Sequence, residues 1–507
     1  MASGWGPEPF EILDGGTKEE AADARAGEAE FGASGVKPTA GDSPLHITAP
    51  PQPPTAVSRR EAAYMMAIFC LTGCLLFADQ NLMAPNLTAV ARDFGFSPDQ
   101  RDRLLGGVVA ASFYLVGAPA ALLFGWLCDR VDRRRLLFAA VVLGEAPALL
   151  TLAVRRYWQL LLLRVLTGIS LGGAFPLIFS LVGDLTTTAR RATAAAVIQV
   201  SLGAGLAVGQ GIAGFVGPSL GWRAPFAIVA APTVVLAVLM LCTTRDPPRG
   251  RTEEALAEVF EGNPGFVYDE RMTWSKAGIL LRTPTNICAI GQGLFGCIPW
   301  GMLLTFLNDF LAQERRLSVQ AATTVLLCIG IGGALGVLGG GLLGQWIYNR
   351  RKAAMPVFIG LSTMLGTLPM WYVLNGDVGR RYTATLVAAL GVGFASSTMG
   401  PNARAMLLNV NEPEMRGLAL ALQSMLDDLG KGLGPVFVAA LISGLGRTAA
   451  LNLAAAGWLP CGALILLAAF SVERDEEAVQ ARLRQSIARM AEEVGERELL
   501  TAAGSQH

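Results

Sequence analysis

Long apolar blocks separated by short polar connections run through most of this chain. The blocks cover roughly residues 63–86, 104–124, 136–154, 157–183, 193–217, 224–243, 286–311, 320–347, 354–374, 382–408, 415–444 and 449–472. Each is close to the ~20 residues with which a helix crosses about 30 Å of hydrocarbon. Backbone groups in lipid must pair within their own segment, so the blocks predict helices rather than open strands. We therefore expect an all-α membrane protein with about twelve transmembrane helices.

Polar segments divide these helices into two groups of six. Residues 1–60 are acidic, rich in glycine and alanine and punctuated by prolines, which predicts a disordered cytoplasmic tail. The longest internal connection, 244–285, predicts a cytoplasmic linker between an N-terminal six-helix bundle, 61–243, and a C-terminal six-helix bundle, 286–472. In 473–507, apolar residues recur every three or four positions among charges. We expect an amphipathic cytoplasmic helix there that caps the bundle, with membrane-surface or partner binding as the alternative.

The distribution of loop charges predicts the orientation. An even number of spans places both termini on one side. The loops after even-numbered spans carry more arginine and lysine than the opposite loops, including Arg130, Arg133, Arg134, Arg135, Arg190, Arg191, Arg245, Arg249, Arg251, Arg350, Arg351, Lys352 and Arg416. By the positive-inside rule, we expect an integral, multi-pass membrane protein with both termini in the cytoplasm. The plasma membrane and an endolysosomal membrane are both left open.

Composition excludes several classes of protein. Charged residues make up 16% of the 507 residues, against about 25% in an ordinary soluble domain. Lys+Arg and Asp+Glu are both 40, so nothing indicates a nucleic-acid partner. The histidines His46 and His507 lie in the polar tails and the eight cysteines form no CxxC pair, so we expect neither a metal nor a cofactor. No nucleotide-binding loop and no intramembrane nucleophile–base pair is visible, so we expect neither a nucleotide partner nor an enzyme.

The second half of the chain resembles a duplicate of the first. A shift of about 225 residues aligns Gly168 with Gly393, Pro176 with Pro401, Arg191 with Arg416, Gly205 with Gly430 and Gly209 with Gly434. These identities keep one register across two spans and their loop. Parallel repeats about a central axis place a substrate site between the halves, near the bilayer midplane. We therefore expect two six-helix bundles that rock about a shared cleft.

The loop after the second span carries the most specific motif. It reads Gly125-Trp-Leu-Cys-Asp129-Arg130-Val-Asp132-Arg133-Arg134-Arg135, which resembles the signature loop of the major facilitator superfamily and implies that fold. An acidic side chain at a helix end can pair with a neighbouring helix N-terminus and a nearby arginine, and such a contact holds one transporter state and breaks in the other. Asp129 and Arg133 are the candidate latch. Further gating candidates are Arg130, Arg191 and Arg416; the alternative for the arginines is that they only fix topology.

Within that superfamily, the chain resembles the Spinster-like proteins. The resemblance rests on Asp79 in span 1, Arg164-Val-Leu-Thr-Gly168 in span 4, Asp184-Leu185 followed by Arg191, Asp246-Pro-Pro-Arg-Gly250 after span 6, and Asp428 in span 11. Two positions depart from the family's pattern, because Gln80 replaces its arginine beside the span-1 acid and Leu171 replaces its span-4 glutamate. The resemblance implies transport of lysophospholipids, sphingolipid-type molecules or sugar-linked solutes, often coupled to protons. The departures leave the substrate and the coupling chemistry open.

Each charge inside an apolar span costs at least ~3 kcal/mol and therefore marks a candidate site. Arg164 can bind a phosphate or carboxylate, or form a structural ion pair. Asp79 can carry a proton, or can be a helix-end carboxylate in water. Glu145 in span 3 can form an interhelical hydrogen bond or take part in coupling. Arg404 in span 10 can meet the substrate or extend to the cytoplasmic surface.

Span 11 carries three charges within about one helical turn. Asp427 and Lys431 are four residues apart, which favours an ion pair on one helix face. Asp428 then points elsewhere and is a candidate free acid for coupling. The uncharged polar and aromatic residues that can complete the cleft, or simply pack between helices, are Tyr114, Gln199, Gln292, Trp300, Asn308 and Asn402.

Together these features predict a secondary active transporter that works by alternating access. Its expected partners are a small organic solute or a lysolipid- or sphingolipid-like amphiphile, membrane lipids and, as a hypothesis, protons carried by Asp79 or Asp428. A sugar or organic-anion carrier of the same superfamily and a non-transporting membrane receptor or scaffold are the alternatives. An amphiphile transporter predicts an apolar cleft lining, whereas a sugar carrier predicts a closed and polar one.

Overall fold

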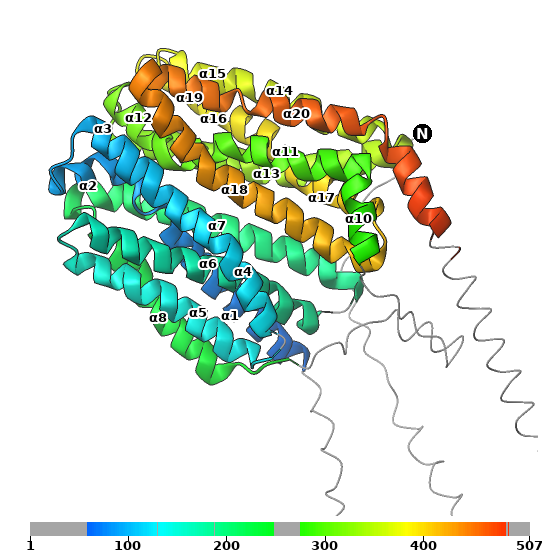
Figure 1. The fold of residues 1–507 in the computed structure, drawn as a ribbon. Coiled ribbons are helices and arrows are strands. Elements are labelled where there is room, and N and C mark those ends of the chain that lie inside the picture. Colours follow the sequence, from blue (N-terminus) through cyan, green and yellow to red (C-terminus); the bar gives the residue numbers. More distant parts are fainter. Residues whose placement is uncertain (1–57, 129, 187, 248–273, 483–484, 486–507) are drawn as a thin grey trace, which may run out of the picture. The chain divides into compact units, whose positions relative to one another are not determined.

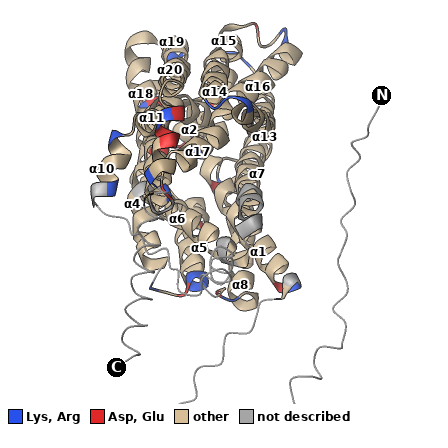
Figure 2. Cartoon of the chain, turned by 90° about the vertical axis from the view of Figure 1, so that its right-hand side faces the viewer, with Lys and Arg blue, Asp and Glu red and all other residues tan. Residues whose placement is uncertain are grey.

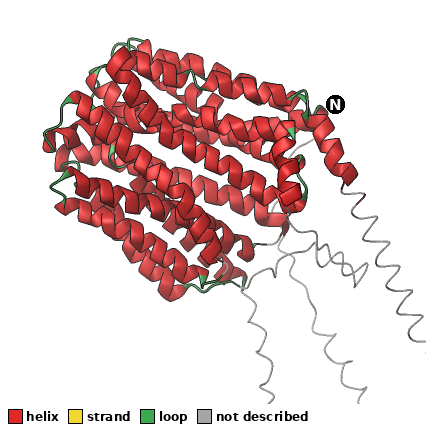
Figure 3. Cartoon of the chain, viewed as in Figure 1, coloured by secondary structure: helices red, strands yellow, loops and turns green. Residues whose placement is uncertain are grey.

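The computed structural model describes residues 58–128, 130–186, 188–247, 274–482 and 485, and the regular structure among them is entirely helical (Figure 3). The predictions of a disordered first tail, of most of the linker and of the end of the amphipathic tail fall on residues outside this set. The all-α fold class is confirmed.

The first half of the described chain is built from eight α-helices and four 3-10 or π-helical segments (Figure 1). The α-helices are α1 (Arg59–Ala78), α2 (Leu87–Asp93), α3 (Pro98–Gln100), α4 (Ala110–Cys128), α5 (Arg133–Leu150), α6 (Tyr157–Leu185), α7 (Thr188–Leu220) and α8 (Ala224–Thr243). The other segments are the 3-10 turns η2 (Asp79–Asn81), η3 (Ala84–Asn86) and η5 (Thr151–Ala153) and the π-helix η4 (Arg101–Val109).

The second half repeats this plan. Its described helices are α10 (Trp274–Arg282), α11 (Pro284–Met302), the π-helix η6 (Leu303–Leu307), α12 (Asn308–Gln313), α13 (Val319–Arg350), α14 (Ala354–Leu365), α15 (Thr367–Asn375), α16 (Tyr382–Ser397), α17 (Met399–Asn409), α18 (Pro413–Leu445), α19 (Arg447–Ala455) and α20 (Trp458–Ala468). In Figure 1 the helices from α11 onward group together on one side of those from α1 to α8.

Twelve stretches of the described helices are long and apolar enough to cross a membrane, as predicted. They are Arg60–Asp93, Pro98–Cys128, Arg133–Ala153, Tyr157–Val182, Val197–Leu220, Ala224–Thr243, Pro284–Gln313, Val319–Arg350, Ala354–Asn375, Tyr382–Asn409, Met415–Leu445 and Arg447–Ala468. Their outward faces are apolar: Leu122 is 70% exposed, Val235 69% and Leu342 77%. Most of the helical ribbon carries no charge colour in Figure 2. Such a surface suits lipid and not water.

Local capping sets where two of the spans begin. The carboxylate of Asp132 accepts a hydrogen bond from the backbone N–H of Arg135 at the start of α5. At the start of α13, the hydroxyl of Ser318 accepts from the N–H of Ala321. Each such cap satisfies a backbone donor that the helix cannot pair internally and is worth about 1 kcal/mol. These short, capped turns hold consecutive spans antiparallel.

Two close helix crossings share one geometry at positions that the predicted repeat aligns. A Cβ on Gly209 of α7 would lie 1.9 Å from the carbonyl oxygen of Ala78 in α1. A Cβ on Gly434 of α18 would lie 2.7 Å from the carbonyl oxygen of Ile298 in α11. The glycines four residues earlier in α7 and α18 meet α1 and α11 in the same way. Thus α7 crosses α1 as α18 crosses α11, and only glycine permits both approaches.

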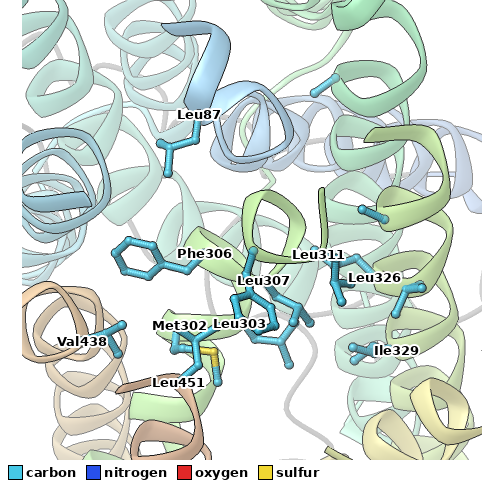
Figure 4. Packing of buried hydrophobic residues seen from close by; sticks show 14 of the residues in the cluster. Leu87, Met302, Leu303, Phe306, Leu307, Leu311, Leu326, Ile329, Val438 and Leu451 are labelled. Carbon is cyan, nitrogen blue, oxygen red and sulfur yellow. The ribbon is translucent and has the colours of Figure 1, made fainter. Parts of the chain in front are cut away.

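Three buried apolar clusters form the interior. One consists wholly of first-half residues, from Met65 to Met240, and one wholly of second-half residues, from Leu280 to Val472. The third cluster, around η6, contains residues of both halves, such as Leu87, Phe306 and Val438 (Figure 4). The two halves therefore share one of the three buried cores. We call the end of the spans that carries the connections after odd-numbered spans the far face, and the end where α1 begins and α20 ends the tail face.

The described part of the C-terminal tail is a helix over 472–482 that packs on the tail face of the second half. Asp475 accepts a hydrogen bond from the Thr285 hydroxyl at 2.8 Å. Glu476 pairs with Lys352 at 2.8 Å. These contacts hold the described part of the tail against the bundle, and the amphipathic helix beyond it stays a prediction.

The glycine crossing gives a stability test. We expect Gly209→Ala to lower the thermal unfolding midpoint of the detergent-solubilised protein by several degrees, because the new Cβ meets backbone and such overpacking costs ~1–3 kcal/mol. Gly211→Ala is the matched control, since nothing lies within 4 Å of a Cβ there. Alanine is about 1 kcal/mol better than glycine in a helix, so this control should melt at the same temperature or higher. Equal melting of the two variants would contradict the crossing.

Candidate functional site

A small cavity of about 50 Å³ lies between the two halves. It is lined by Gln80, Asn81, Met83, Ala84, Leu87, Val109, Ala110, Phe113, Tyr114, Arg164, Leu304 and Thr305. Leu304 and Thr305 belong to η6 of the second half, and the other lining residues belong to spans 1, 2 and 4 of the first half. Seven of the twelve lining residues are apolar, so the one charged residue, Arg164, lies in a largely apolar wall.

Arg164 is held in this wall by an ion pair with Asp79. Its Nη1 lies 3.4 Å from each carboxylate oxygen of Asp79, and the side chains are 5% and 0% exposed. Its guanidinium carbon lies 4.7 Å from the ring centroid of Phe226. Among the described residues, Nε and Nη2 of Arg164 are buried and have no hydrogen-bond partner. The interpretation of Asp79 as a carboxylate in water is wrong, because η2 turns it inward against Arg164.

A second acid stands beside this pair. Glu145 of α5 is fully buried, and neither of its carboxylate oxygens has a hydrogen-bond partner within the described part of the chain. Both Asp79 and Arg164 act on it electrostatically. The predicted interhelical hydrogen bond of Glu145 is not formed. The hydroxyl of Ser170, which lies over Gly144, donates instead to the carbonyl of Ala140 at 2.6 Å.

In α18 the ion pairing differs from the prediction. Lys431 pairs with Asp428, three residues earlier, at 3.3 Å, and these side chains are 31% and 42% exposed. Asp427 lies over α11, where its Oδ1 would be 2.2 Å from a Cβ on Gly293. The prediction of an Asp427–Lys431 pair with Asp428 as the free acid was wrong, because the packing of α18 on α11 turns Asp427 away from the cleft. Arg404 of α17 is half-buried and interacts electrostatically with Asp427.

One of the other predicted polar residues belongs to the cavity. The hydroxyl of Tyr114 accepts a hydrogen bond from Gln80 at 2.7 Å, and both residues line the cavity. Charges on Lys431 and Asp428 act on Tyr114 from the other half. The polar group of Tyr114 therefore joins the Arg164 region of the first half to the α18 charges of the second.

The remaining predicted polar residues pack between helices. The amide of Asn402 donates to the carbonyl of Gly340 at 3.0 Å, and that of Asn308 donates to Thr323 at 2.8 Å. Gln292 accepts a hydrogen bond from the thiol of Cys461 at 3.3 Å, and Trp300 packs edge-to-face against Trp458. Gln199 lies half-buried on α7 and does not line the cavity. For these residues the structure supports packing rather than substrate contact.

A buried ion cluster joins the two halves at the far face. Arg447 lies 2.7 Å from Asp309 and 3.2 Å from Asp102. Arg101 lies 2.8 Å from Asp102 and 3.4 Å from Asp309. Glu314 is a more exposed member, 3.9 Å from Arg447. Each half contributes one arginine and one buried aspartate, so every buried charge has an opposite charge across the boundary. We call these five residues the far-face ion cluster.

Sequence reasoning missed the far-face ion cluster. Arg101 and Arg447 lie in or beside the less basic loops, and the sequence predicts no site for them. Asp309 lies near the end of the apolar block 286–311 and was not singled out as an intramembrane charge. An aspartate inside an apolar block was the available signal, since such a residue needs a partner. Its partners lie 138 or more positions away in sequence, so spacing alone does not identify them.

The gating candidates at the tail face contact their own half. Arg133 is buried and lies 2.8 Å from Asp246, and Arg130 donates to the carbonyl of Trp126 at 3.1 Å. Arg416 donates to the carbonyl of Leu408 at 2.9 Å. Asp129 lies outside the described residues, and so does the side chain of Arg191. The Asp129 latch therefore stays a prediction, and the described partner of Arg133 is the aspartate of the Asp-Pro-Pro-Arg-Gly element after span 6.

These contacts define a conformation that is closed at the far face. There the halves share an apolar core around η6 and the far-face ion cluster. Toward the tail face, the buried cores are separate for each half. Closure at one face over a cavity between two repeats is the arrangement that alternating access requires.

Comparisons with known proteins agree with this geometry. The sequence profile described as the Major Facilitator Superfamily matches residues 69–392. The chain is 24% identical over 404 residues to protein spinster homolog 3 of Danio rerio, which covers 78% of this chain and 79% of that protein. It is 24% identical over 327 residues to the hexuronate transporter of Bacillus subtilis (strain 168), which covers 64% of this chain and 75% of that protein.

A solved structure shares the fold. It is that of a bacterial homolog of the human lysosomal transporter Spinster, in an inward-facing and unoccupied conformation. The TM-score is 0.72 at 18% sequence identity, and the match covers 82% of this chain and 99% of that chain.

The far-face ion cluster gives a test of closure. We expect Asp309→Asn to favour opening of the far face, because both arginines lose a shared carboxylate; removing one partner of a buried pair costs ~3 kcal/mol, roughly a hundredfold in the ratio of two states. Spin labels on the exposed positions Asp99 and Gln313, one in each half, report the far-face separation by double electron–electron resonance. The variant should gain a population at longer distance.

A matched substitution controls for loss of charge at this face. Asp93 pairs with Arg223 at 2.7 Å, and both belong to the first half. Asp93→Asn should leave the label separation unchanged. An Asp309→Asn distance distribution identical to that of the parent protein would contradict the role of the cluster in closure.

Proposed function

Because this chain belongs to the Major Facilitator Superfamily and is Spinster-like, we propose that it is a secondary active transporter for an organic anion with a substantial apolar part. Anionic lysolipid-like amphiphiles belong to this substrate class. The observation that carries the proposal is Arg164, which lines a largely apolar cavity between the two halves and whose guanidinium keeps two buried donors without a partner in the described part of the chain.

The charges around the cavity favour an anion. Arg164 offers a planar guanidinium that matches carboxylate and phosphate geometry. Lys431 supplies a second cation from the other half, close enough to act on Tyr114, which lines the cavity. Both cations are already partnered by aspartates, so a substrate anion competes with Asp79 or Asp428 for them. The name of the hexuronate transporter, a relative at 24% identity, is that of a carrier for an acid and supports the same charge.

The lining favours an apolar body on that anion. Apolar side chains such as Met83, Val109 and Phe113 line the same cavity as Arg164, its one charged lining residue. A sugar carrier needs polar partners for many hydroxyl groups, because each hydroxyl left without a hydrogen bond in a buried site is costly. The five polar lining residues are Gln80, Asn81, Tyr114, Arg164 and Thr305. Gln80 already donates to Tyr114 and Arg164 already pairs with Asp79, which leaves few free groups for hydroxyls. An amphiphilic anion therefore fits this wall better than a neutral sugar.

We further propose that transport is coupled to protons. An anion that takes the guanidinium of Arg164 leaves the carboxylate of Asp79 without its counter-ion. An uncompensated charge in a dry wall costs several kcal/mol, so the freed acid takes up a proton instead. One monoanion would then enter the site with one proton, and the charge of the wall would stay constant.

The loop charges support an orientation with the tail face in the cytoplasm. The far-face ion cluster would then close the site on the extracytoplasmic side. In this proposal the cavity opens to each compartment in turn as the far-face contacts break and tail-face contacts form. A carrier that works in this way has no need of a nucleotide.

Arg164 gives the test of this function. We expect Arg164→Ala to reduce pH-gradient-driven uptake of the best organic anion from a substrate panel in proteoliposomes at least about tenfold, because a charge-assisted hydrogen bond worth ~1.5–3 kcal/mol is lost. Arg223→Lys is the control, since Arg223 pairs with Asp93 at the far face and lies outside the cavity. This control should transport as the parent protein does.

Three outcomes would contradict the proposal. Uptake of neutral sugars but of no anion would favour the sugar carrier. Anion uptake at the parent rate in Arg164→Ala would remove Arg164 from the site. Saturable anion binding with no uptake under any gradient would favour the receptor or scaffold.

A further inference from the structure

The site around Arg164 contains more carboxyl groups than it can neutralise. Arg164 is one guanidinium, and it faces two acids, Asp79 and Glu145. Asp79 takes the guanidinium through both of its oxygens. Glu145 is fully buried and has no hydrogen-bond partner among the residues described. A carboxylate in that position would be a buried, unpaired charge, which proteins avoid by keeping the acid neutral.

The other elements packed against α5 offer no cation to Glu145. From α6 the charged residue that faces it is Arg164, and from span 1 it is Asp79. α8, which packs closely along α5, contains no charged residue and only Cys242 as a titratable one, at its tail-face end. α4 contributes Tyr114, whose hydroxyl is used by Gln80. The arginines of α5 itself lie at its first turn, ten or more residues from Glu145.

We propose that Glu145 is a proton-binding residue of this transporter: it holds a proton while Arg164 pairs with Asp79, and it passes that proton to Asp79 when Arg164 turns to Glu145. In this step the O–H bond of Glu145 breaks and an O–H bond forms on Asp79. The guanidinium moves from Asp79 to Glu145 as the proton moves from Glu145 to Asp79, so the net charge of the three groups is unchanged. Asp79 then exchanges the proton with water in the cavity, which its neighbours Gln80 and Asn81 line. This inference rests on the proposed function, since it names a proton store for the same site.

The position of Glu145 explains why the exchange needs Arg164. Neither acid lines the cavity, but Asp79 is bonded in the chain to the lining residue Gln80 and pairs with the lining residue Arg164, whereas α5 contributes no lining residue. Direct exchange of the Glu145 proton with cavity water is therefore blocked. The route to water runs through Asp79, and Asp79 accepts a proton only when the guanidinium leaves it. Without an anion the site holds one proton, which lies on Glu145 while Arg164 pairs with Asp79 and on Asp79 while Arg164 pairs with Glu145.

Infrared spectroscopy tests this without any substrate. Purified protein in lipid nanodiscs at neutral pH should show a protonated-carboxyl band that is absent from Glu145→Gln. The band should also be absent from Asp79→Asn, because Arg164 then pairs with Glu145 and Glu145 ionises. Ser170→Ala is the control, since it alters the same α5–α6 contact without a change of charge and should keep the band. A Glu145 that is neutral for packing alone would keep its band in Asp79→Asn.

Transport separates this inference from the proposed function. Glu145→Gln should lose proton-driven accumulation of the anion at least tenfold and keep anion exchange across the membrane at the parent rate. Should Glu145→Gln fail to fold, Glu145→Leu gives the same two readouts. Proton-driven accumulation at the parent rate in either variant, or an infrared band that persists in Glu145→Gln, would overturn the inference. The absence of anion uptake by the parent protein would refute the proposed function, while the infrared result would still decide whether Glu145 holds a proton.

Discussion

The guanidinium of Arg164 must be neutralised wherever it lies inside its span, and the arrangement of the site follows from this constraint. A charge at the centre of a bilayer costs at least ~3 kcal/mol, so an arginine in a largely apolar wall needs a counter-ion. Asp79 supplies that partner, with both of its oxygens 3.4 Å from Nη1. A ligand that takes the guanidinium must therefore replace one negative charge with another. This exchange favours anions over neutral solutes, and it ties anion binding to the protonation of the acid that is displaced.

Two ion networks lie at different depths and have different consequences. The far-face ion cluster joins the halves, and its charges are balanced between them, so breaking it separates residues that are otherwise satisfied. The Arg164–Asp79 pair lies within the first half, and in the proposed cycle the guanidinium exchanges Asp79 for another acid. The first network sets which face is closed, and the second sets what occupies the cavity. Both networks lie next to the shared core around η6, so a change in cavity occupancy affects the packing between the two halves.

Much of the fold could be predicted from the sequence, because length and hydropathy of the spans are set locally. The repeat could also be predicted, since glycines such as Gly209 and Gly434 are needed wherever two backbones cross closely. Arg164 and Asp79 were each identifiable as charges in apolar runs, but their partnership was not. In span 11, spacing permitted Lys431 to pair with an acid three or four residues earlier, and tertiary packing on α11 decided between them.

The site's remaining features depend on contacts distant in sequence. Glu145 was recognised as an acid in a span, yet its lack of a partner is a property of the packed α1, α5 and α6 and not of the segment around it. The far-face ion cluster likewise forms only when two halves meet. Such features require coordinates, because the chemistry of each residue is fixed by neighbours that the chain brings together from far apart.

The most direct test of this account is the number of protons that accompany each anion. Proteoliposomes that contain a trapped pH-sensitive dye and receive a labelled organic monoanion report both fluxes in one experiment. The account predicts internal acidification in proportion to anion uptake, at one proton per monoanion. Anion uptake with no accompanying proton would show that the charge of the Arg164 wall is not conserved and would contradict the account.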